Sequence, residues 1–289
     1  MPGRVRRVML IPMKPAAFDY ARPRSLSEAL ELLARPNIDS RVIAGGQSLV
    51  AMMNLRVASP GLLVDIARLP DLGSVTEEDS TVFYGACVTH AMIEDRAGPD
   101  PSGGLMPKVA ETLAYRAVRN RGTIGGSLAL ADPAAEWPCV LAALDATAII
   151  EGWNGKKAVA CKDFVTGIYE TRLAAGEILA AIWVPKLSPS ARWGYVKLAR
   201  KAGEFALSLA VAVRDPARGY ARVVLGATDG PPLILDAASR LCARGAPDPK
   251  AAREAIAADL ARAADRQFDA FRHSLHATAA FRALTQATA

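Results

Sequence analysis

Two pairs of adjacent glycines have the residue types and spacing of an anion-binding site. They lie in AGGQS at residues 44–48 and in TIGGS at residues 123–127. Because glycine has no Cβ, the backbone N–H groups beside it can approach a ligand closely, and a run of such groups binds anions. Two loops of this kind could hold a diphosphate between them. For each loop alone, a tight turn without a ligand is the alternative.

Neither loop has the spacing of the common nucleotide-binding motifs. The G-x-G-x-x-G pattern of dinucleotide-binding folds and the Walker A pattern do not fit residues 44–48 or 123–127. A standard NAD or ATP cradle is therefore disfavoured. If the loops bind a ligand, we expect valine at Gly46 or Gly125 to abolish that binding while leaving the chain folded.

The cysteines and histidines do not indicate a metal centre on this chain. The four cysteines are Cys87, Cys139, Cys161 and Cys242. They include no C-x-x-C pair, the usual source of ligands for iron–sulfur clusters and structural zinc, and their scatter fits a reducing cytoplasm. His273 and His276 lie one helical turn apart without a third ligand nearby, so we expect them on a solvated helix face.

Composition indicates an ordinary globular protein of about two domains. Apolar residues make up 51% and charged residues 22% of the 289 residues. Half of the net charge of +6 comes from Arg4, Arg6 and Arg7, within residues 1–12 that we expect to form a flexible extension, with Met13 as an alternative start. No basic stripe interleaved with aromatics accompanies the charge, so we expect no nucleic-acid partner. We also expect no membrane span, since no stretch offers ~20 mostly apolar residues.

Predicted elements surround the first glycine pair on both sides. Ser25 and Glu28 form a capping box for a helix over 25–35, and a short strand at 41–44 leads through the glycines into a helix at 49–55. Further short strands are expected at 64–66 and 81–86, and Thr89 caps a helix at 90–95. The first half of the chain is therefore mixed α and β.

The second glycine pair is followed by a helix and then by a change of pattern. Asp132 and Pro133 have the types of an N-cap and first-turn residue for a helix ending near residue 144. After about residue 188, three apolar runs at 193–200, 206–213 and 220–227 predict an antiparallel meander, followed by helices at 250–263 and 268–286. The predicted fold class is α+β, with a domain boundary near residues 186–190.

Several longer stretches carry a family resemblance. In chain order they are MKPAAFDYARPRSLSEAL, IAGGQSLVAMMNLR, VDIARLPDL, YGACVTHAMIE, VRNRGTIGGSLALADPAAE, DFVTGIYET with GEILAAIWVP, and GYVKLARKAGEFA. They resemble the FAD-binding medium subunit of the molybdenum hydroxylase family, the group of xanthine dehydrogenase and aerobic carbon monoxide dehydrogenase. The resemblance implies a two-lobed FAD-binding domain of the PCMH type over 13–187 and a small domain over 188–289 with a three-stranded antiparallel sheet and helices.

The resemblance also implies a cofactor site for a non-covalent FAD. The residues that would wrap its diphosphate and ribityl are Val42, Ile43, Ala44, Gly45, Gly46, Gln47, Ser48, Leu49, Thr123, Ile124, Gly125, Gly126 and Ser127. They would use backbone N–H groups and the hydroxyls of Ser48, Thr123 and Ser127. Gln47 stands where members similar to carbon monoxide dehydrogenase often have histidine, which weakens assignment to that substrate.

Four further residues match family positions near the cofactor, each with an ordinary alternative. Glu136, where the family usually has Asp, would accept from the cofactor's hydroxyls or act as a first-turn helix carboxylate. Tyr84 and Leu179 would line the flavin or belong to the core. Lys197 would stabilise the reduced, anionic flavin or point outward from a strand. Asp132 fits a helix cap better than a cofactor ligand.

The implied function is that of an electron-transfer subunit. Electrons would leave a substrate at a molybdenum cofactor on a large partner, pass through [2Fe–2S] clusters on a small partner and reach this FAD. They would then go to an external acceptor such as NAD, a quinone or oxygen, and the assembly is expected to be a dimer of heterotrimers. The alternatives are a self-contained FAD-dependent oxidase and an assembly subunit that has lost FAD. The complex is expected in the cytoplasm, with membrane association through the complex as the alternative.

Overall fold

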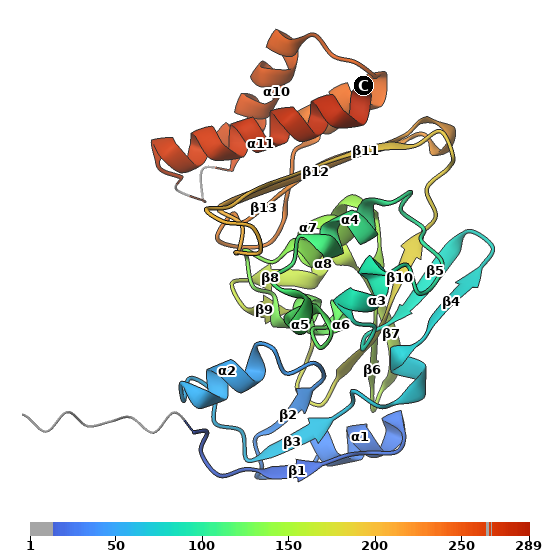
Figure 1. Cartoon of the computed structure of the whole chain (residues 1–289), viewed down its shortest axis with the longest axis vertical. Helices are drawn as coiled ribbons and strands as arrows, with labels where there is room; N and C mark the ends of the chain where they lie inside the picture. The colour runs from blue at the N-terminus through green and yellow to red at the C-terminus, as the bar shows by residue number, and fades with distance from the viewer. Residues whose placement is uncertain (1–13, 264–265, 267) are drawn as a thin grey trace, which may run out of the picture.

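The described residues, 14–263, 266 and 268–289, form three tiers in the computed structural model (Figure 1). A small parallel sheet lies at one end and a five-stranded antiparallel sheet with short helices lies in the middle. A second antiparallel sheet, covered by the last helices, lies at the other end. The architecture confirms the predicted α+β class. The expected extension at residues 1–12 lies outside the described residues.

The first lobe contains three parallel strands in the order β1-β3-β2. Its elements are β1 (Asp19–Ala21), α1 (Leu26–Leu33), β2 (Ser40–Ile43), α2 (Leu49–Asn54) and β3 (Leu62–Asp65). The Ser25 hydroxyl accepts from the Glu28 N–H at 3.1 Å, and the Glu28 carboxylate accepts the Arg24 N–H at 2.7 Å. The predicted N-cap of α1 at Ser25 is therefore confirmed, while the Glu28 carboxylate binds the N–H of the residue before the N-cap and not that of Ser25, as a standard capping box would.

The second lobe is built on an antiparallel sheet in the order β4-β5-β10-β6-β7. The strands are β4 (Val75–Glu78), β5 (Thr81–Gly85), β6 (Thr147–Gly152), β7 (Gly155–Ala160) and β10 (Ile178–Pro185). The 3-10 helix η1 (Pro70–Gly73) leads into it. Its other elements are α3 (His90–Glu94), α4 (Leu105–Glu111), α5 (Arg116–Arg119), α6 (Ile124–Leu130), α7 (Glu136–Ala143), α8 (Cys161–Phe164), β8 (Val165–Gly167) and β9 (Glu170–Thr171).

The predicted start of α7 is wrong. The helix begins at Glu136, and Asp132 forms a turn before it instead of the N-cap. The Asp132 carboxylate accepts the Ala134 N–H at 2.9 Å, while the Asp132 carbonyl accepts the Ala135 N–H at 3.0 Å. Aspartate commonly makes such local bonds to the backbone, and here they favour a turn over the first helical turn.

The C-terminal tier has the order β11-β12-β13-β14. Its strands are β11 (Arg192–Leu198), β12 (Ser208–Asp215), β13 (Tyr220–Gly226) and β14 (Leu233–Ile234), with the 3-10 helix η2 (Pro216–Arg218) between β12 and β13. The helices are α9 (Asp236–Arg244), α10 (Pro249–Arg262) and α11 (Ala270–Thr288). The three predicted antiparallel strands are present, and the two-residue β14 adds a fourth. In the described chain, no helix combines the length and apolar character needed to cross a membrane.

The expectation that both α11 histidines face solvent is wrong for His276. Its side chain is fully buried, and its Nδ1 lies 2.9 Å from the Ser208 hydroxyl on β12. The Phe268 ring lies 4.6 Å from it, centroid to centroid. His273 is exposed, as predicted. Within the described residues, no group of three or more His, Cys, Asp and Glu side chains is arranged to hold a metal ion.

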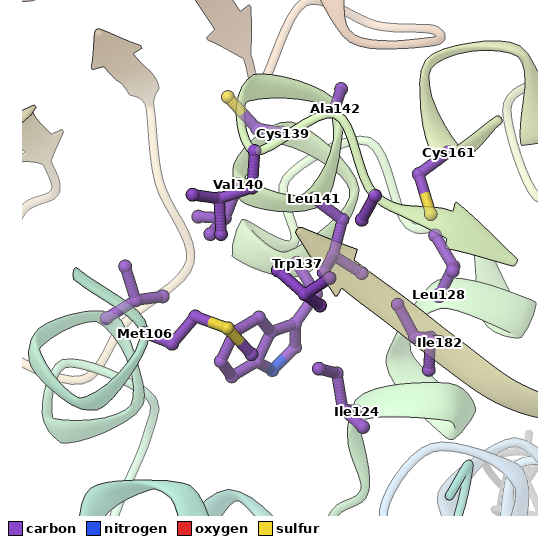
Figure 2. Packing of buried hydrophobic residues seen from close by; sticks show 14 of the residues in the cluster. Met106, Ile124, Leu128, Trp137, Cys139, Val140, Leu141, Ala142, Cys161 and Ile182 are labelled. Carbon is purple, nitrogen blue, oxygen red and sulfur yellow. The ribbon is translucent and has the colours of Figure 1, made fainter. Parts of the chain in front are cut away.

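The core is centred on α7, every residue of which is buried (Figure 2). Trp137 and Val140 pack in the same cluster as Leu209 and Val211 of β12, so the C-terminal sheet closes the core of the second lobe. The opposite face of that sheet packs on α11, which presents mainly alanines. A Cβ at Gly194 would overlap the Ala283 carbonyl, which shows how closely α11 approaches β11.

Candidate functional site

The first glycine pair lies where β2 ends and α2 begins. Gly46 has a φ of +71°, a left-handed conformation that glycine adopts without strain. None of the backbone N–H groups of residues 45–49 donates to an acceptor within residues 14–263, 266 and 268–289. Consecutive amides without partners form a concave donor surface that suits an anion. This loop therefore offers a run of unpartnered backbone donors, which an anion site requires.

The second glycine pair has a different hydrogen-bonding state. The backbone N–H groups of residues 124–127 are already paired, with the carbonyls of Ala86, Val88 and Thr123 and the Thr123 hydroxyl as acceptors at 2.9 to 3.0 Å. Thr123 is the N-cap of α6. In this conformation the second loop is a fixed scaffold, and an anion would depend on the amides of the first loop.

An added Cβ at either glycine would meet atoms of the protein itself. A Cβ at Gly125 would overlap the Ala86 backbone and side chain. A Cβ at Gly46 would lie 3.1 Å from Val50 Cγ2 in a backbone conformation that strains other residues. The expectation that valine at Gly125 leaves the chain folded therefore does not hold, because its side chain would enter the protein and not the ligand's space.

The first loop touches the residues that lead into the second loop. A Cβ at Gly45 would overlap the carbonyl of Arg121 and lie 2.9 Å from the Gly122 Cα. Gly45 belongs to the first lobe and residues 121–122 belong to the second, so the backbones of the two lobes meet here without side chains between them. The structure thus places the first loop against the residues that immediately precede the second loop.

The hydroxyls at the junction differ in their partners. The hydroxyls of Ser48 and Ser127 form no hydrogen bond to the described chain, while that of Thr123 accepts the Gly126 N–H at 2.9 Å. The Gln47 side-chain amide donates to the Gly45 carbonyl at 3.3 Å. The remaining predicted residues of the first loop, Val42, Ile43, Ala44 and Leu49, are half-buried beside it.

Glu136 and Lys197, predicted separately, form one buried ion pair. The Lys197 Nζ lies 2.6 Å from the Glu136 Oε1, and the two side chains are 8% and 4% exposed. Lys197 also donates to the Thr112 carbonyl at 3.0 Å. Burial raises the pKa of Glu136, and the Lys197 ammonium acts against that rise. The pair joins the first turn of α7 to β11 of the C-terminal sheet.

Alternate residues of β11 continue this polar connection. The Trp193 indole donates to the Gly103 carbonyl at 3.0 Å, and the Tyr195 hydroxyl lies 2.8 Å from the Thr112 hydroxyl. Trp193, Tyr195 and Lys197 share one face of the strand because side chains alternate along it. That face therefore fixes the C-terminal sheet to the region around α4 by three side chains.

Tyr84 and Leu179 lie in the core of the second lobe. Tyr84 is 3% exposed, and its hydroxyl donates to the Pro99 carbonyl at 2.9 Å. Burial raises the pKa of Tyr84 well above its ordinary value. Leu179 is 4% exposed and lies at a bulge in the pairing of β10 with β6. In this conformation both side chains act as core residues.

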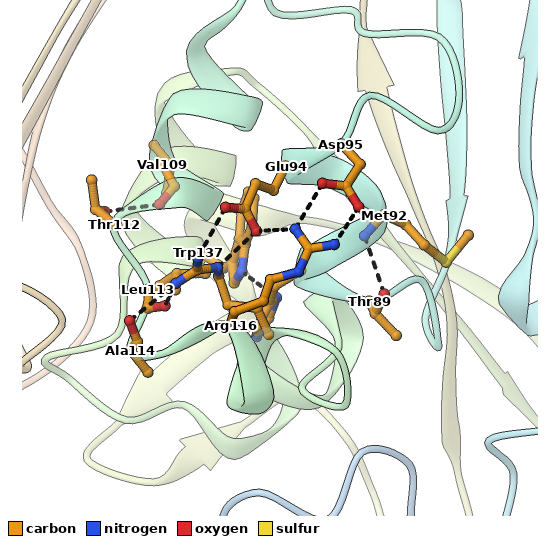
Figure 3. A network of polar contacts seen from close by, with 12 residues as sticks. Thr89, Met92, Glu94, Asp95, Val109, Thr112, Leu113, Ala114, Arg116 and Trp137 are labelled. Carbon is orange, nitrogen blue, oxygen red and sulfur yellow. Dashed lines mark hydrogen bonds and ion pairs between the residues drawn. The ribbon is translucent and has the colours of Figure 1, made fainter.

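Sequence reasoning missed a polar network that joins α3 to α5, the helix before the second loop (Figure 3). Arg119 of α5 binds both carboxylate oxygens of Glu94 on α3, at 2.8 and 2.9 Å, and Arg116 bridges Glu94 and Asp95. Burial and Arg119 lower the pKa of His90 to about 4. The available signal was the helical spacing of Arg116 and Arg119 just before the glycine loop.

Comparisons with known proteins identify the family of the chain. The family described as "FAD binding domain in molybdopterin dehydrogenase" matches residues 16–187. The chain is 36% identical over 224 residues to the carbon monoxide dehydrogenase medium chain of Hydrogenophaga pseudoflava, covering 77% of this chain and 78% of that one. It is 36% identical over 221 residues to the nicotine 6-hydroxylase medium subunit of Paenarthrobacter nicotinovorans, covering 75% and 77%.

A solved structure shows the same similarity over nearly the whole chain. A chain of carbon monoxide dehydrogenase from Hydrogenophaga pseudoflava, in a form lacking the Mo-pyranopterin moiety of the molybdenum cofactor, superimposes with a TM-score of 0.87 at 33% identity. The match covers 94% of this chain and 98% of that chain. Together with the paired glycine loops, these matches show that the chain belongs to the family of FAD-binding subunits of molybdopterin dehydrogenases.

Proposed function

We propose that this chain is the FAD-containing electron-transfer subunit of a molybdenum hydroxylase complex. The observation that carries the proposal is the unpartnered amide run at residues 45–49, whose first residue, Gly45, lies against residues 121–122 of the other lobe. The relatives whose names call them medium chains or subunits support the same role. In this role the chain receives electrons from clusters on a partner and passes them to an external acceptor.

The residues present fit FAD as the cofactor. The amides of residues 45–49 would hold the diphosphate, and the hydroxyls of Ser48 and Ser127 are available to its oxygens or to the ribityl. When bound, FAD accepts electrons singly or in pairs and so connects one-electron clusters to two-electron acceptors. The protein's part is to bind and orient it. Non-covalent binding predicts that acid precipitation releases all of the flavin.

In this proposal Glu136 and Lys197 act as a charged pair. They lie where α7 of the cofactor-binding domain meets β11 of the C-terminal sheet. The pair is closed in this structure, with Lys197 bound to both Glu136 and the Thr112 carbonyl. Lys197 would contribute positive charge to the flavin region, and Glu136 would hold that ammonium in place. Tyr84 and Leu179 would support the site from the core.

We further propose that the chain assembles with a large molybdenum-cofactor subunit and a small [2Fe–2S] subunit, in a dimer of heterotrimers. The relatives named as medium chains and subunits support such partners. The four cysteines are all free and buried, which suits a reducing compartment such as the cytoplasm. Clusters would therefore be ligated by another chain.

Titration of the purified apo chain with FAD tests the cofactor, and purification of the complex from its native cell tests the role. We expect saturable quenching of flavin fluorescence and co-purification of molybdenum, iron and two further chains. Absence of FAD binding would contradict both the electron-transfer role and an oxidase. FAD binding with no partner chains, together with turnover by the isolated chain, would favour the self-contained oxidase.

A further inference from the structure

The second glycine loop is laid against the segment that precedes α3. The Gly125 N–H donates to the Ala86 carbonyl at 3.0 Å, the Ile124 N–H donates to the Val88 carbonyl at 3.0 Å, and the His90 N–H donates to the Gly122 carbonyl at 2.9 Å. The two segments therefore run antiparallel, with Thr89 bridged to Thr123. This pairing ends at His90.

The His90 side chain also lies against Gly122, whose carbonyl accepts the His90 N–H. A Cβ at Gly122 would lie 2.9 Å from both Cδ2 and Nε2 of the imidazole, so the ring occupies the space of a side chain at residue 122. The Gly122 Cα is also the atom that a Cβ at Gly45 would approach to 2.9 Å. One glycine thus contacts both the imidazole and the first glycine loop.

Trp137 of α7 fixes the orientation of the imidazole. The Trp137 indole N–H donates to His90 Nδ1 at 3.1 Å, and the two rings stack with centroids 5.9 Å apart. Because an indole N–H only donates, Nδ1 is the acceptor and the ring proton lies on Nε2. His90 is 8% exposed and Trp137 is fully buried, so the ring has little freedom to move.

The helix that carries His90 is itself held to the helix before the loop. Arg119 binds the Glu94 carboxylate at two points and also donates to the carbonyls of Leu113 and Ala114 at 2.8 and 3.0 Å (Figure 3). Bidentate arginine–carboxylate pairs are geometrically specific. Arg119 therefore fixes the distance between α3, which carries His90, and α5, which leads into the second loop.

We propose that His90 is a positioning residue for FAD binding, acting through Gly122. Its ring holds the backbone of residues 121–122 against Gly45, and this contact keeps the amides of residues 45–49 convergent on the diphosphate. The inference rests on the proposed FAD site and adds a residue that does not itself touch the cofactor. A shift of a few tenths of an ångström at Gly122 is enough to disturb such a donor set.

The test measures the effect of Gly122→Ala in the full-length chain twice, once with His90 present and once with His90 replaced by alanine. The variants are Gly122→Ala, His90→Ala and the double variant, and the dissociation constant for FAD is measured by flavin fluorescence. The melting temperature of each apo chain is measured in parallel. Gly73→Ala is the matched control, because a Cβ at Gly73 meets nothing within 4 Å.

If His90 acts through Gly122, alanine at 122 weakens FAD binding roughly tenfold or more in the native background and less than about threefold once the imidazole is gone. Removal of the ring takes away both contacts at 2.9 Å and leaves the Val118 carbonyl oxygen, 3.3 Å from the new methyl group, as a neighbour that needs only a small shift. Gly73→Ala leaves the dissociation constant unchanged. If His90→Ala does not fold, His90→Asn, which retains an acceptor for Trp137 in a smaller side chain, replaces it.

An equal loss from Gly122→Ala in both backgrounds would overturn the proposal, and so would FAD affinities that only follow the apo melting temperatures. Either result would make His90 a general core residue. Failure of the proposed function looks different, because the unmodified chain and the Gly73→Ala control would then also bind no FAD.

Discussion

The Lys197 ammonium lies 2.6 Å from the Glu136 carboxylate, although the two residues come from different tiers of the fold. Glu136 begins α7, and Lys197 lies on β11 of the C-terminal sheet. A buried pair of this kind is costly to break on one side, because the remaining charge has no partner and no water. The pair therefore couples the FAD-binding lobe to the C-terminal sheet.

We expect Lys197→Met alone to destabilise the chain by about 3–5 kcal/mol, because it leaves Glu136 buried without its partner. The double variant Lys197→Met/Glu136→Gln should lose less than the single lysine variant, since no unpaired charge remains. Urea denaturation of the three chains measures this difference. The exposed pair Lys108–Glu111, whose side chains are 54% and 58% exposed, is the control.

Breaking the control pair should cost no more than about 1 kcal/mol. If Lys197→Met and the double variant were equally unstable, the loss would come from packing and not from the unpaired Glu136 charge. The pair would then be a weak connection between the tiers.

Two buried histidines predict that stability declines as the pH falls. Burial lowers the pKa of His90 and of His276 to about 4 each, with Arg119 and Arg272 adding to the effect. A histidine in the unfolded chain titrates near 6.5, so the unfolded state binds more protons than the folded state between pH 6.5 and 4. Their contribution to stability is complete above pH 6.5 and is lost as the pH falls through that range.

At pH 4 the loss should reach roughly 3 kcal/mol for each histidine. Urea midpoints between pH 7.5 and 4.5 measure the slope, and His90→Asn and His276→Asn should each flatten it. The exposed His273→Asn is the control and should leave the slope as it is. An unchanged slope in both buried variants would assign acid sensitivity to the carboxylates instead.

The sequence-based prediction succeeded where local chemistry decides the structure. The N-caps at Ser25 and Thr89 depend on neighbours a few residues away, and both are present. The start of α7 was misplaced because Asp132 can satisfy its carboxylate in a turn as well as in a cap. Both outcomes follow from the same short-range hydrogen bonds.

The missed features depend on residues that are distant in the sequence. His276 was expected in solvent because its own helix gives no reason for burial, whereas its environment is set by Ser208 on β12. His90 has its partner 47 positions away in Trp137. Both glycine loops could be recognised in the sequence. Their roles differ because the carbonyls of Ala86 and Val88 accept hydrogen bonds from amides of the second loop, and the sequence around the loop does not reveal this pairing.

Gly125→Ala should destabilise the apo chain, in contrast to the earlier expectation of a purely functional effect. The added Cβ would overlap Ala86, and overpacking of this kind costs about 1–3 kcal/mol. Thermal unfolding without FAD measures the loss, and Gly73→Ala should unfold at the original temperature. If Gly125→Ala melted normally but bound no FAD, the glycine would face the cofactor after all.

The division of roles between the loops makes a final prediction about the serines. Ser48 and Ser127 have hydroxyls without partners in the described chain, whereas the donors proposed to hold the diphosphate are main-chain amides. Each serine-to-alanine variant should therefore weaken FAD binding only about 2- to 10-fold, the effect of one hydrogen bond worth about 0.5–1.5 kcal/mol. Flavin titration measures it, with the exposed Ser190→Ala as control. Complete loss of FAD in either variant, with an intact melting temperature, would move the main donor role from the amides of the first loop to that hydroxyl.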